Sequence, residues 1–249
     1  MSGHSKWSSI KHRKAAVDSK RGKIFTKIIR EITVAAKIGG PDPDANPRLR
    51  AAVLNARGQN MPNDTVARAI KKGSGGNDGV DYEEVTYEGF GPANVAVVVE
   101  ALTDNRNRTI ASIRTAFNKY NGSLGSSNSV LFMFDRKGSV LIPQSAIDED
   151  SLTETVLEAG GEDLELIGED YQIICSIEDF EVVKSAIDAK GLPVKESGLT
   201  HVPQNKTVIS EKEDAEKVMN FIDMLEEDDD VQKVYTNFDI DDKLLAEFS

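Results

Sequence analysis

The sequence predicts a multidomain α+β protein, in which an all-α N-terminal helical domain precedes two α+β ferredoxin-like domains and the third domain is inserted in the second. Three observations predict this fold class. Residues 1–75 show helical periodicity and are strongly basic. A Gly-rich polar run, "KKGSGGNDGVD" at 71–81, is then typical of a linker. Beyond it, strand and helix patterns follow one another to about residue 240.

The first predicted helix lies between Asp18, which would serve as its N-cap, and Gly39 with Gly40, which would stop it. One face of this helix is apolar and the opposite face is cationic, because both sets recur at helical spacing. Only Glu31 interrupts the cationic face. The apolar set is Phe25, Ile28, Ile29, Ile32, Ala35 and Ala36, and the cationic set is Lys20, Lys23, Lys27, Arg30 and Lys37.

Two shorter helices are predicted next in the first domain. The second covers 47–58, with Asn46 as its cap and a proline at its first position. The third covers 63–72, beginning at Asn63 and ending at Gly73. Together the three helices make residues 1–75 an all-α domain.

The remaining chain is predicted to form a second domain, 76–134 plus 203–240, and an inserted third domain, 135–202. In the insertion, the order strand, helix, strand, strand, helix, strand is typical of a ferredoxin-like unit. The elements after residue 203 cannot form a core alone, so we expect them to complete the sheet begun at residue 83. For the second domain the predicted strands are 83–89, 94–102, 129–134, 206–210 and 231–238, with helices 105–120 and 211–226. For the insertion the predicted strands are 138–142, 163–167, 171–176 and 194–201, with helices 145–159 and 178–190.

Charge is distributed very unevenly along the chain. The whole protein has a formal net charge of -12, yet residues 1–75 carry sixteen Lys and Arg against five Asp and Glu. Salt confines the field of each surface patch to a Debye length of about 8 Å, so a basic domain acts locally whatever the overall charge. The overall acidity therefore does not exclude a nucleic-acid partner.

Most of the basic residues in the first domain are candidate phosphate contacts. The same residues would also fit a solubilising surface, or a surface that docks onto the chain's own acidic half. Trp7 either stacks on an unpaired base or packs against the helices. The candidate nucleic-acid-binding residues are Lys6, Trp7, Lys11, His12, Arg13, Lys14, Lys20, Arg21, Lys23, Lys27, Arg30, Arg48, Arg50, Lys71 and Lys72, with Arg57 and Arg68 adding to the patch.

A candidate anion site lies in "TDNRNRT", where Asn105, Arg106, Asn107 and Arg108 follow Thr103 or Asp104 as a helix N-cap. Arginines in a first helical turn are disfavoured by the helix dipole, so an anion there would compensate. The alternative is that both arginines pair with Asp or Glu of the third domain. The following run "NGSLGSSNS", 121–129, is predicted to be a helix stop and turn, since it lacks the Lys of a P-loop.

Several classes of function are not expected. No apolar run approaches the roughly 20 residues that span a bilayer, and no secretory signal is present, so we expect a cytoplasmic protein without a membrane partner. The three His residues have no metal-ligand spacing and no catalytic motif occurs, so we expect no metal, cofactor, small-molecule substrate or enzymatic activity. Cys175 is predicted to be a buried structural thiol, and "EEDDD" at 226–230 a solvated helix end.

Four blocks of the sequence together resemble the YebC family, which includes the mitochondrial translational activators. They are "GHSKWSSIKHRKAAVDSKRGKIFTKIIREITVAAKIGG", "NPRLRAAVLNARGQNMPNDTVARAIKKG", "TDNRNRTIASIRTAFNKYNGSLG" and "VLFMFDRKG". The resemblance runs from residue 3 to about 240. It implies three domains, with the third inserted in the second, and a cytoplasmic, non-enzymatic regulator of gene expression.

The resemblance does not choose between two kinds of nucleic acid. The family is commonly described as probable DNA-binding transcriptional regulators, whereas bacterial members are also proposed to act at the ribosome, as RNA-binding translation factors. A third hypothesis is a protein adaptor whose basic domain contacts an acidic partner. The first two predict steep salt dependence with nucleic acid, and the third predicts none.

Overall fold

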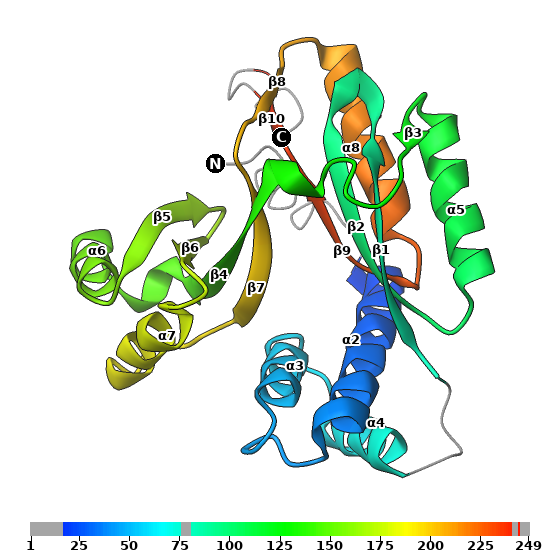
Figure 1. Ribbon diagram of the computed structural model, residues 1–249. Helices are drawn as coiled ribbons and strands as arrows, with labels where there is room; N and C mark the ends of the chain where they lie inside the picture. The colour runs from blue at the N-terminus through cyan, green and yellow to red at the C-terminus, as the bar shows by residue number, and fades with distance from the viewer. Residues whose placement is uncertain (1–16, 76–80, 241–243, 245–249) are drawn as a thin grey trace. The chain divides into compact units, whose positions relative to one another are not determined.

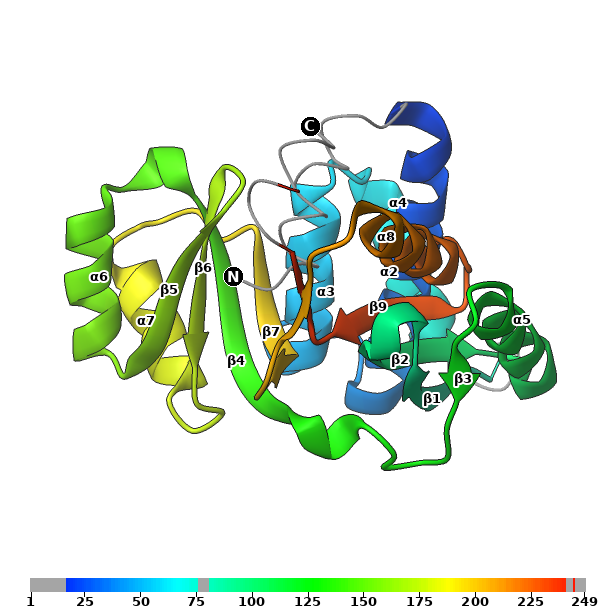
Figure 2. The ribbon, with the colours of Figure 1, turned by 90° about the horizontal axis from the view of Figure 1, so that it is seen from above.

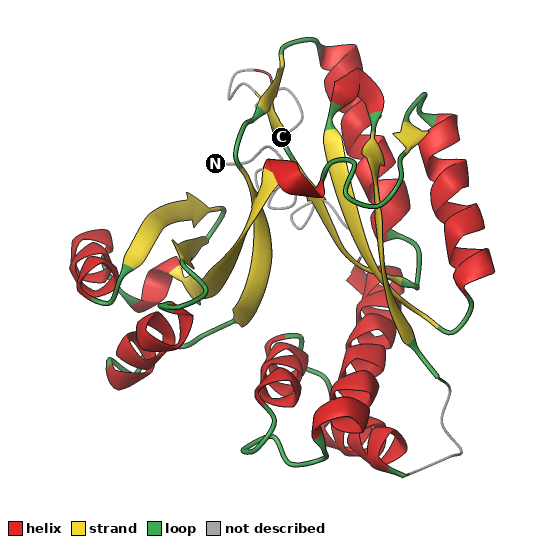
Figure 3. Cartoon of the chain, viewed as in Figure 1, coloured by secondary structure: helices red, strands yellow, loops and turns green. Residues whose placement is uncertain are grey.

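The computed structural model describes residues 17–75, 81–240 and 244 (Figure 1). One compact unit is formed by Asp135–Val202, and a second by the described residues before and after it. Figure 3 shows helices alone at the start of the chain and helices combined with strands beyond. None of the helices in these ranges is long and apolar enough to cross a membrane.

The N-terminal domain consists of the helices α2 (Val17–Gly39), α3 (Pro47–Gly58) and α4 (Asn63–Ser74), close to the three predicted ranges. The Asn46 side chain accepts a hydrogen bond from the Leu49 backbone N–H at 3.1 Å, so the predicted cap of α3 is confirmed. The residue preceding α4 is Pro62, without a side-chain cap. The apolar faces meet in one core of Ile28, Ile32, Ala35, Ala36, Leu49, Ala52, Ala56, Met61, Val66 and Ala69.

Gly73 lets α4 approach α2 closely. A Cβ atom added there would lie 2.2 Å from the carbonyl oxygen of Thr33 and 2.9 Å from Cβ of Ala36. The helix continues past this glycine to Ser74, although the sequence suggested that Gly73 ends it. The glycine serves interhelical packing and does not stop the helix.

The second domain is built on a four-stranded sheet in the order β3-β1-β2-β9. The helices α5 and α8 pack against one face, where Phe117 and Phe221 make an edge-on ring contact with centroids 4.9 Å apart. Val98 lies on the opposite face, where Val130 and Phe134 cover it. The elements are β1 (Glu83–Phe90), β2 (Ala96–Thr103), α5 (Arg106–Lys119), β3 (Ser123–Leu124), β8 (Thr207–Ile209), α8 (Lys212–Glu226), β9 (Val231–Thr236) and β10 (Phe238–Ile240).

The tail after residue 203 completes this sheet through β9, which pairs antiparallel with β2, as predicted. The predicted strand 206–210 is displaced from the sheet. Its counterpart β8 pairs in parallel with β10 to form a separate two-stranded sheet. The tail therefore extends the domain core as well as the main sheet.

The strand predicted at 129–134 is wrong, because Leu131–Met133 is a short 3₁₀ helix. The carboxylate of Glu88, a buried residue of β1, accepts hydrogen bonds from the backbone N–H groups of Asn128, Val130 and Leu131 at 2.6, 3.0 and 2.8 Å. These N–H groups are therefore not available to a strand neighbour. The run 121–129, which was predicted to be a helix stop and turn, contains the short strand β3, and β3 pairs with β1.

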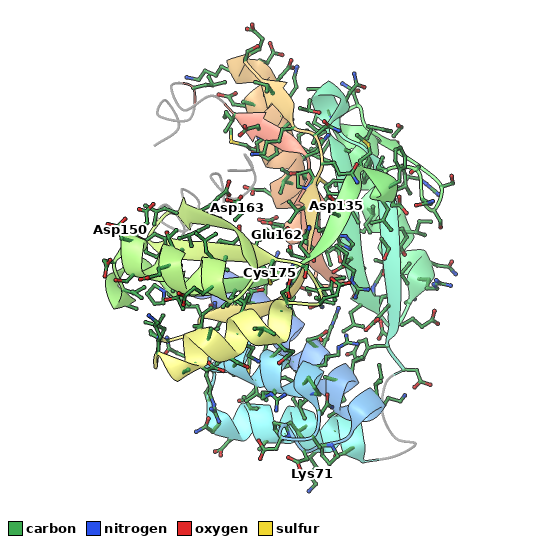
Figure 4. The ribbon with its side chains drawn as sticks, turned by 60° about the vertical axis from the view of Figure 1, so that its left-hand side comes forward. Lys71, Asp135, Asp150, Glu162, Asp163 and Cys175 are labelled. Carbon is green, nitrogen blue, oxygen red and sulfur yellow. The ribbon has the colours of Figure 1, made fainter. Side chains whose placement is uncertain are left out.

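The unit Asp135–Val202 carries a four-stranded sheet in the order β5-β6-β4-β7, with both helices on one face (Figure 2). This is the ferredoxin-like arrangement that the element order predicted. Cys175 lies buried in its core (Figure 4), as expected, and burial raises the pKa of its thiol to about 11. The elements are β4 (Phe134–Pro143), α6 (Glu149–Glu158), β5 (Gly161–Ile167), β6 (Asp170–Cys175), α7 (Phe180–Ala189) and β7 (Glu196–Pro203).

The predicted multidomain α+β class is confirmed, but the ferredoxin-like description fits only one of its two α+β parts. In the second domain, β1 and β2 are consecutive antiparallel neighbours with no α-helix between them, only the short 3₁₀ helix Pro92–Asn94. A ferredoxin-like unit requires a helix between its first two strands. The second domain is thus an α+β domain of a different strand order.

Candidate nucleic-acid interface

The described residues of α3 and α4 expose a group of cations, which we call the α3–α4 cationic surface. The buried side of α4 carries Val66 and Ala69, so its polar residues face outward. Figure 4 shows Lys71 turned away from the helices. The surface consists of Arg50, Arg57, Arg68, Lys71 and Lys72.

The cations of this surface differ in how the protein holds them. Arg68 donates hydrogen bonds to the Asp64 carbonyl and the Thr65 hydroxyl, both at 3.2 Å. Lys71 and Lys72 lie in the last turn of α4, where the helix dipole favours positive charge. Neither ammonium group has an ion-pair partner in the described part of the chain, so both charges remain available to a ligand.

The central cations of the α2 cationic face are candidate phosphate contacts, and in the structure each of them contacts the chain's own acidic segment. The Lys23 ammonium donates to the carbonyl oxygen of Glu227 at 3.1 Å, and the Lys27 ammonium donates to that of Glu226 at 2.6 Å. These carbonyls end α8, where they lack helical partners and carry the negative end of the dipole. This part of α2 therefore docks onto the chain's own acidic segment, which was the alternative to phosphate binding.

Asp230 collects the strongest of these contacts, in what we call the Asp230 cluster. Its carboxylate is 4% exposed and accepts hydrogen bonds from the Arg108 guanidinium, from Nε at 3.0 Å and from one terminal nitrogen at 2.7 Å to each carboxylate oxygen. Arg30 donates to the same carboxylate at 2.6 Å. The hydroxyls of Thr103 and Thr109 complete the cluster at 3.2 and 2.7 Å. The acidic run "EEDDD" thus ends in a buried anion, and the expectation of a solvated helix end was wrong for this residue.

The Asp230 cluster keeps its carboxylate ionised. Burial alone would raise the pKa of Asp230, but the hydrogen bonds from Arg108, Thr109 and Arg30 lower the pKa below its usual value. Removing either arginine would leave this buried charge less compensated and would lower the free energy of unfolding. The cluster therefore joins α2, α5 and the segment before β9.

The candidate anion site at 105–108 is partly occupied by the protein's own acids. Asn105, and not Thr103 or Asp104, is the N-cap of α5, and its side chain accepts from the Arg108 N–H at 3.1 Å. Arg108 is bound to Asp104 and to Asp230, whereas Arg106 pairs with Glu83 at 3.2 Å. The partners belong to the second domain, so the expectation that the third domain supplies them is corrected.

Two further predicted cations are also paired internally. The Arg48 guanidinium contacts Glu31 at 2.6 Å and Glu84, and the hydrogen bond to Glu31 raises its pKa above the usual range. Lys37 forms an ion pair with Asp81. Neither side chain adds unpaired charge to the α3–α4 cationic surface.

Part of the predicted site lies outside the described residues. This holds for Lys6, Trp7, Lys11, His12, Arg13 and Lys14, and the side chains of Lys20 and Arg21 are not described either, although their backbone belongs to α2. Binding by these residues stays a prediction.

Arg108→Ala and Arg106→Ala are expected to differ in stability. Arg108→Ala should lower the free energy of unfolding by roughly 2 to 3 kcal/mol, because it leaves a buried carboxylate with one arginine, while Arg30 limits the loss. Arg106 and Glu83 are about 60% exposed, so Arg106→Ala should cost less than about 1 kcal/mol. Urea denaturation of both variants measures the difference, and equal losses would contradict the assignment of Arg108 to the Asp230 cluster.

Comparison with known proteins agrees with this architecture. A probable transcriptional regulatory protein of Syntrophotalea carbinolica is 54% identical over 246 residues, which cover 99% of this chain and 98% of that protein. One from Desulforapulum autotrophicum is 53% identical over 244 residues, 98% of each chain. The crystal structure of a conserved hypothetical protein from Aquifex aeolicus has a TM-score of 0.87 at 45% identity, covering 93% of this chain and 96% of that one. The fold and these relatives define a multidomain α+β protein of the transcriptional regulatory class.

Family models cover both parts of the chain. The model described as the TACO1/YebC protein N-terminal domain matches residues 5–76, and the model described as the TACO1/YebC second and third domain matches residues 82–238. The chain belongs to the TACO1/YebC family. The resemblance found in the four sequence blocks is thus confirmed.

Proposed function

We propose that this protein is a non-enzymatic, DNA-binding transcriptional regulator whose first domain, residues 1–75, contacts the phosphate backbone. The observation that carries the proposal is the α3–α4 cationic surface, where Lys71, Lys72 and Arg57 are exposed and have no acidic partner among the described residues. When Lys or Arg side chains neutralise DNA phosphates, they release the counterions condensed on the DNA, and this release favours binding. The names of the full-length relatives support a regulatory role.

The proposed contact reads phosphates more than bases. The exposed side of α4 presents Arg68, Lys71 and Lys72, but no array of Asn, Gln and Arg side chains suited to base edges in a major groove. Phosphate contacts fix position and orientation without carrying sequence information. We therefore expect cognate and random duplexes to differ in affinity by less than about 10³.

The internal pairing of α2 changes which residues the proposal emphasises. Lys23, Lys27 and Arg30 hold the acidic segment 226–230, so their substitution would disturb the fold as well as any binding. Lys71 and Lys72 are exposed at the end of α4 and make no such contacts within the described chain. Changes at these two lysines should therefore affect stability only through the helix dipole, by about 1 kcal/mol or less each, while they remove phosphate contacts.

Lys71→Glu/Lys72→Glu is expected to weaken DNA binding in the folded protein. Losing two phosphate contacts should reduce the slope of log K against log salt by roughly 1.8, since each contact contributes about 0.9. Fluorescence anisotropy with a labelled duplex at several salt concentrations measures the slope. Lys184→Glu/Lys190→Glu, two cations of the ferredoxin-like unit, is the matched control with the same change in net charge. An unchanged slope in the α4 variant would remove this surface from the mechanism.

The alternative is a translation factor that binds ribosomal RNA, with the ribosome as its partner. A surface that reads phosphates is compatible with either nucleic acid. Repeating the titration with a structured RNA separates the two hypotheses, because tighter binding of RNA at equal salt would favour the translation factor. The proposal places the protein in the cytoplasm, without a membrane, cofactor or small-molecule substrate. Binding that does not depend on salt would instead favour the protein adaptor.

A further inference from the structure

One stretch of the acidic part of the chain has no acidic residue at all. Residues 76–249 contain 37 Asp and Glu, yet none occurs between Asp104 and Asp135. The 30 residues 105–134 hold four cations and many Ser, Thr and Asn. If the acids of 76–249 were evenly spread, about six of them would fall in this run. Because the sign of the charge of a local patch decides which ligands approach it, this run differs from the rest of the acidic part of the chain.

The structure places much of this run on one exposed surface. α5 buries Thr109, Ile113, Ala116 and Phe117 against the rest of its domain. The opposite side of the helix, which we call the α5 outer face, is exposed. It consists of Asn107, Ser112, Arg114, Thr115, Asn118 and Lys119.

Arg114 is the central cation of the α5 outer face. Asn107 lies two turns before it and Asn118 one turn after it, so the three side chains form a row along the helix. In the described structure, the Arg114 guanidinium has no carboxylate partner. Lys119 lies in the last turn, 5.3 Å from the centre of the Tyr120 ring, where it offsets the negative end of the helix dipole. Arg114 is in mid-helix, where the dipole gives it no such role.

The loop that follows α5 extends this surface with neutral hydrogen-bond donors. Residues 125–128, "GSSN", are exposed, as is Asn121 at the end of the helix. The loop is fixed at both ends, because β3 pairs with β1 and the Glu88 carboxylate binds the N–H groups of Asn128 and Val130. Its donors are therefore held in position beside α5.

The composition of this surface indicates the chemistry of its partner. None of the large apolar side chains exposed in the described structure belongs to α5 or to residues 121–128. The buried centre of a protein interface is enriched in apolar and aromatic residues, whereas nucleic-acid backbones are bound by Arg, Lys, Ser, Thr, Asn and backbone N–H groups. The surface has the second composition.

We propose that the α5 outer face and the 121–128 loop form a second binding surface for the sugar-phosphate backbone of a nucleic acid. This inference rests on the proposed function and adds a contact in the second domain to those of the first. Arg114 and Lys119 bind phosphates, while Asn118 and the loop residues donate neutral hydrogen bonds. Because these contacts carry no base information, the surface increases affinity and salt dependence without adding sequence specificity.

Arg114→Glu/Lys119→Glu in the full chain tests this proposal. Both side chains are exposed, so the melting temperature should fall by at most about 4 °C, mainly through the loss of the Lys119 charge at the end of the helix dipole. The variant should bind a DNA duplex about tenfold more weakly at moderate salt, with the salt slope reduced by roughly 1.8. Arg114→Gln/Lys119→Gln should also bind the duplex more weakly than the wild type, but with a smaller loss of affinity. The difference between the two variants separates the loss of attraction to phosphate from the repulsion that the glutamates add. Lys184→Glu/Lys190→Glu is again the matched control.

The outcomes distinguish this inference from the proposed function. If the wild type binds duplex DNA and Lys71→Glu/Lys72→Glu weakens it, but Arg114→Glu/Lys119→Glu does not, the α5 surface is excluded and the function stands. If the wild type binds neither DNA nor RNA, both proposals fail. Polyglutamate or anionic vesicles that compete with DNA at equal charge concentration would overturn the assignment of a nucleic-acid backbone to this surface.

Discussion

Asp230→Ala is expected to lower the free energy of unfolding by about 3 kcal/mol, although it removes one carboxylate from a very acidic protein. The change leaves Arg108 and Arg30 without their shared anion, and the Thr103 and Thr109 hydroxyls each lose one hydrogen-bond acceptor. Breaking a buried ion pair by removing one partner typically costs 3 to 5 kcal/mol, and we place this case at the lower limit because Arg108 is half exposed. Urea denaturation followed by circular dichroism measures the loss.

Asp229→Ala provides the matched control for this experiment. Asp229 is the neighbouring acid, it is exposed, and only its backbone carbonyl contacts Arg30. Its substitution makes the same change in charge and retains that carbonyl, so stability should change by less than about 0.5 kcal/mol. A similar loss in both variants would mean that net charge, and not the Asp230 cluster, determines the effect.

Glu88→Gln is expected to cost about 2 to 3 kcal/mol. The Glu88 carboxylate accepts three backbone N–H groups of the segment 128–131, and an amide offers one acceptor oxygen in place of two. Its NH₂ group would face an N–H group that then has no acceptor, and each buried unsatisfied donor costs roughly 1 to 3 kcal/mol. Chemical denaturation measures this difference, with Glu158→Gln, at an exposed position of α6, as the control.

The same variant should lose part of the protein's acid sensitivity. Burial would raise the pKa of Glu88, but the N–H groups of Val130, Asn128 and Leu131 lower the pKa below its usual 4.5. A lowered native pKa gives stability that is present above the unfolded pKa and is lost as pH falls through the native one. The stability difference between wild type and Glu88→Gln should therefore shrink as the pH is lowered below about 4.5. A difference that grows on acidification would contradict this account.

The helices were predictable because their signals are local. For α3, the Asn46 cap and the proline after it mark its start, and the structure begins the helix at that proline. The segment 129–134 was not predictable from its apolar composition, which is typical of a strand. Its N–H groups are bound by Glu88, about 40 residues away, and no local pattern reports that contact.

The candidate site shows the same division between local and distant information. The basic character of the first domain is a property of composition, and it correctly indicated exposed cations at Lys71 and Lys72. The engagement of Arg30 depends on Asp230, 200 positions later in the chain. The sequence shows two regions of opposite charge, but it does not show which individual charges meet. Arg114 was not among the candidate residues, because the sequence alone does not show that it lies on the exposed side of α5.

The burial of Cys175 has a practical consequence for experiments on this protein. It is the sole cysteine of the chain, and its thiol stays protonated at neutral pH because burial raises the pKa to about 11. Thiol-directed reagents react with the exposed thiolate, so they should leave this residue unmodified. A cysteine introduced at exposed Ser112 would then take up a maleimide dye selectively, with the native residue retained. The wild-type sequence already serves as a background for single-site fluorescent labelling.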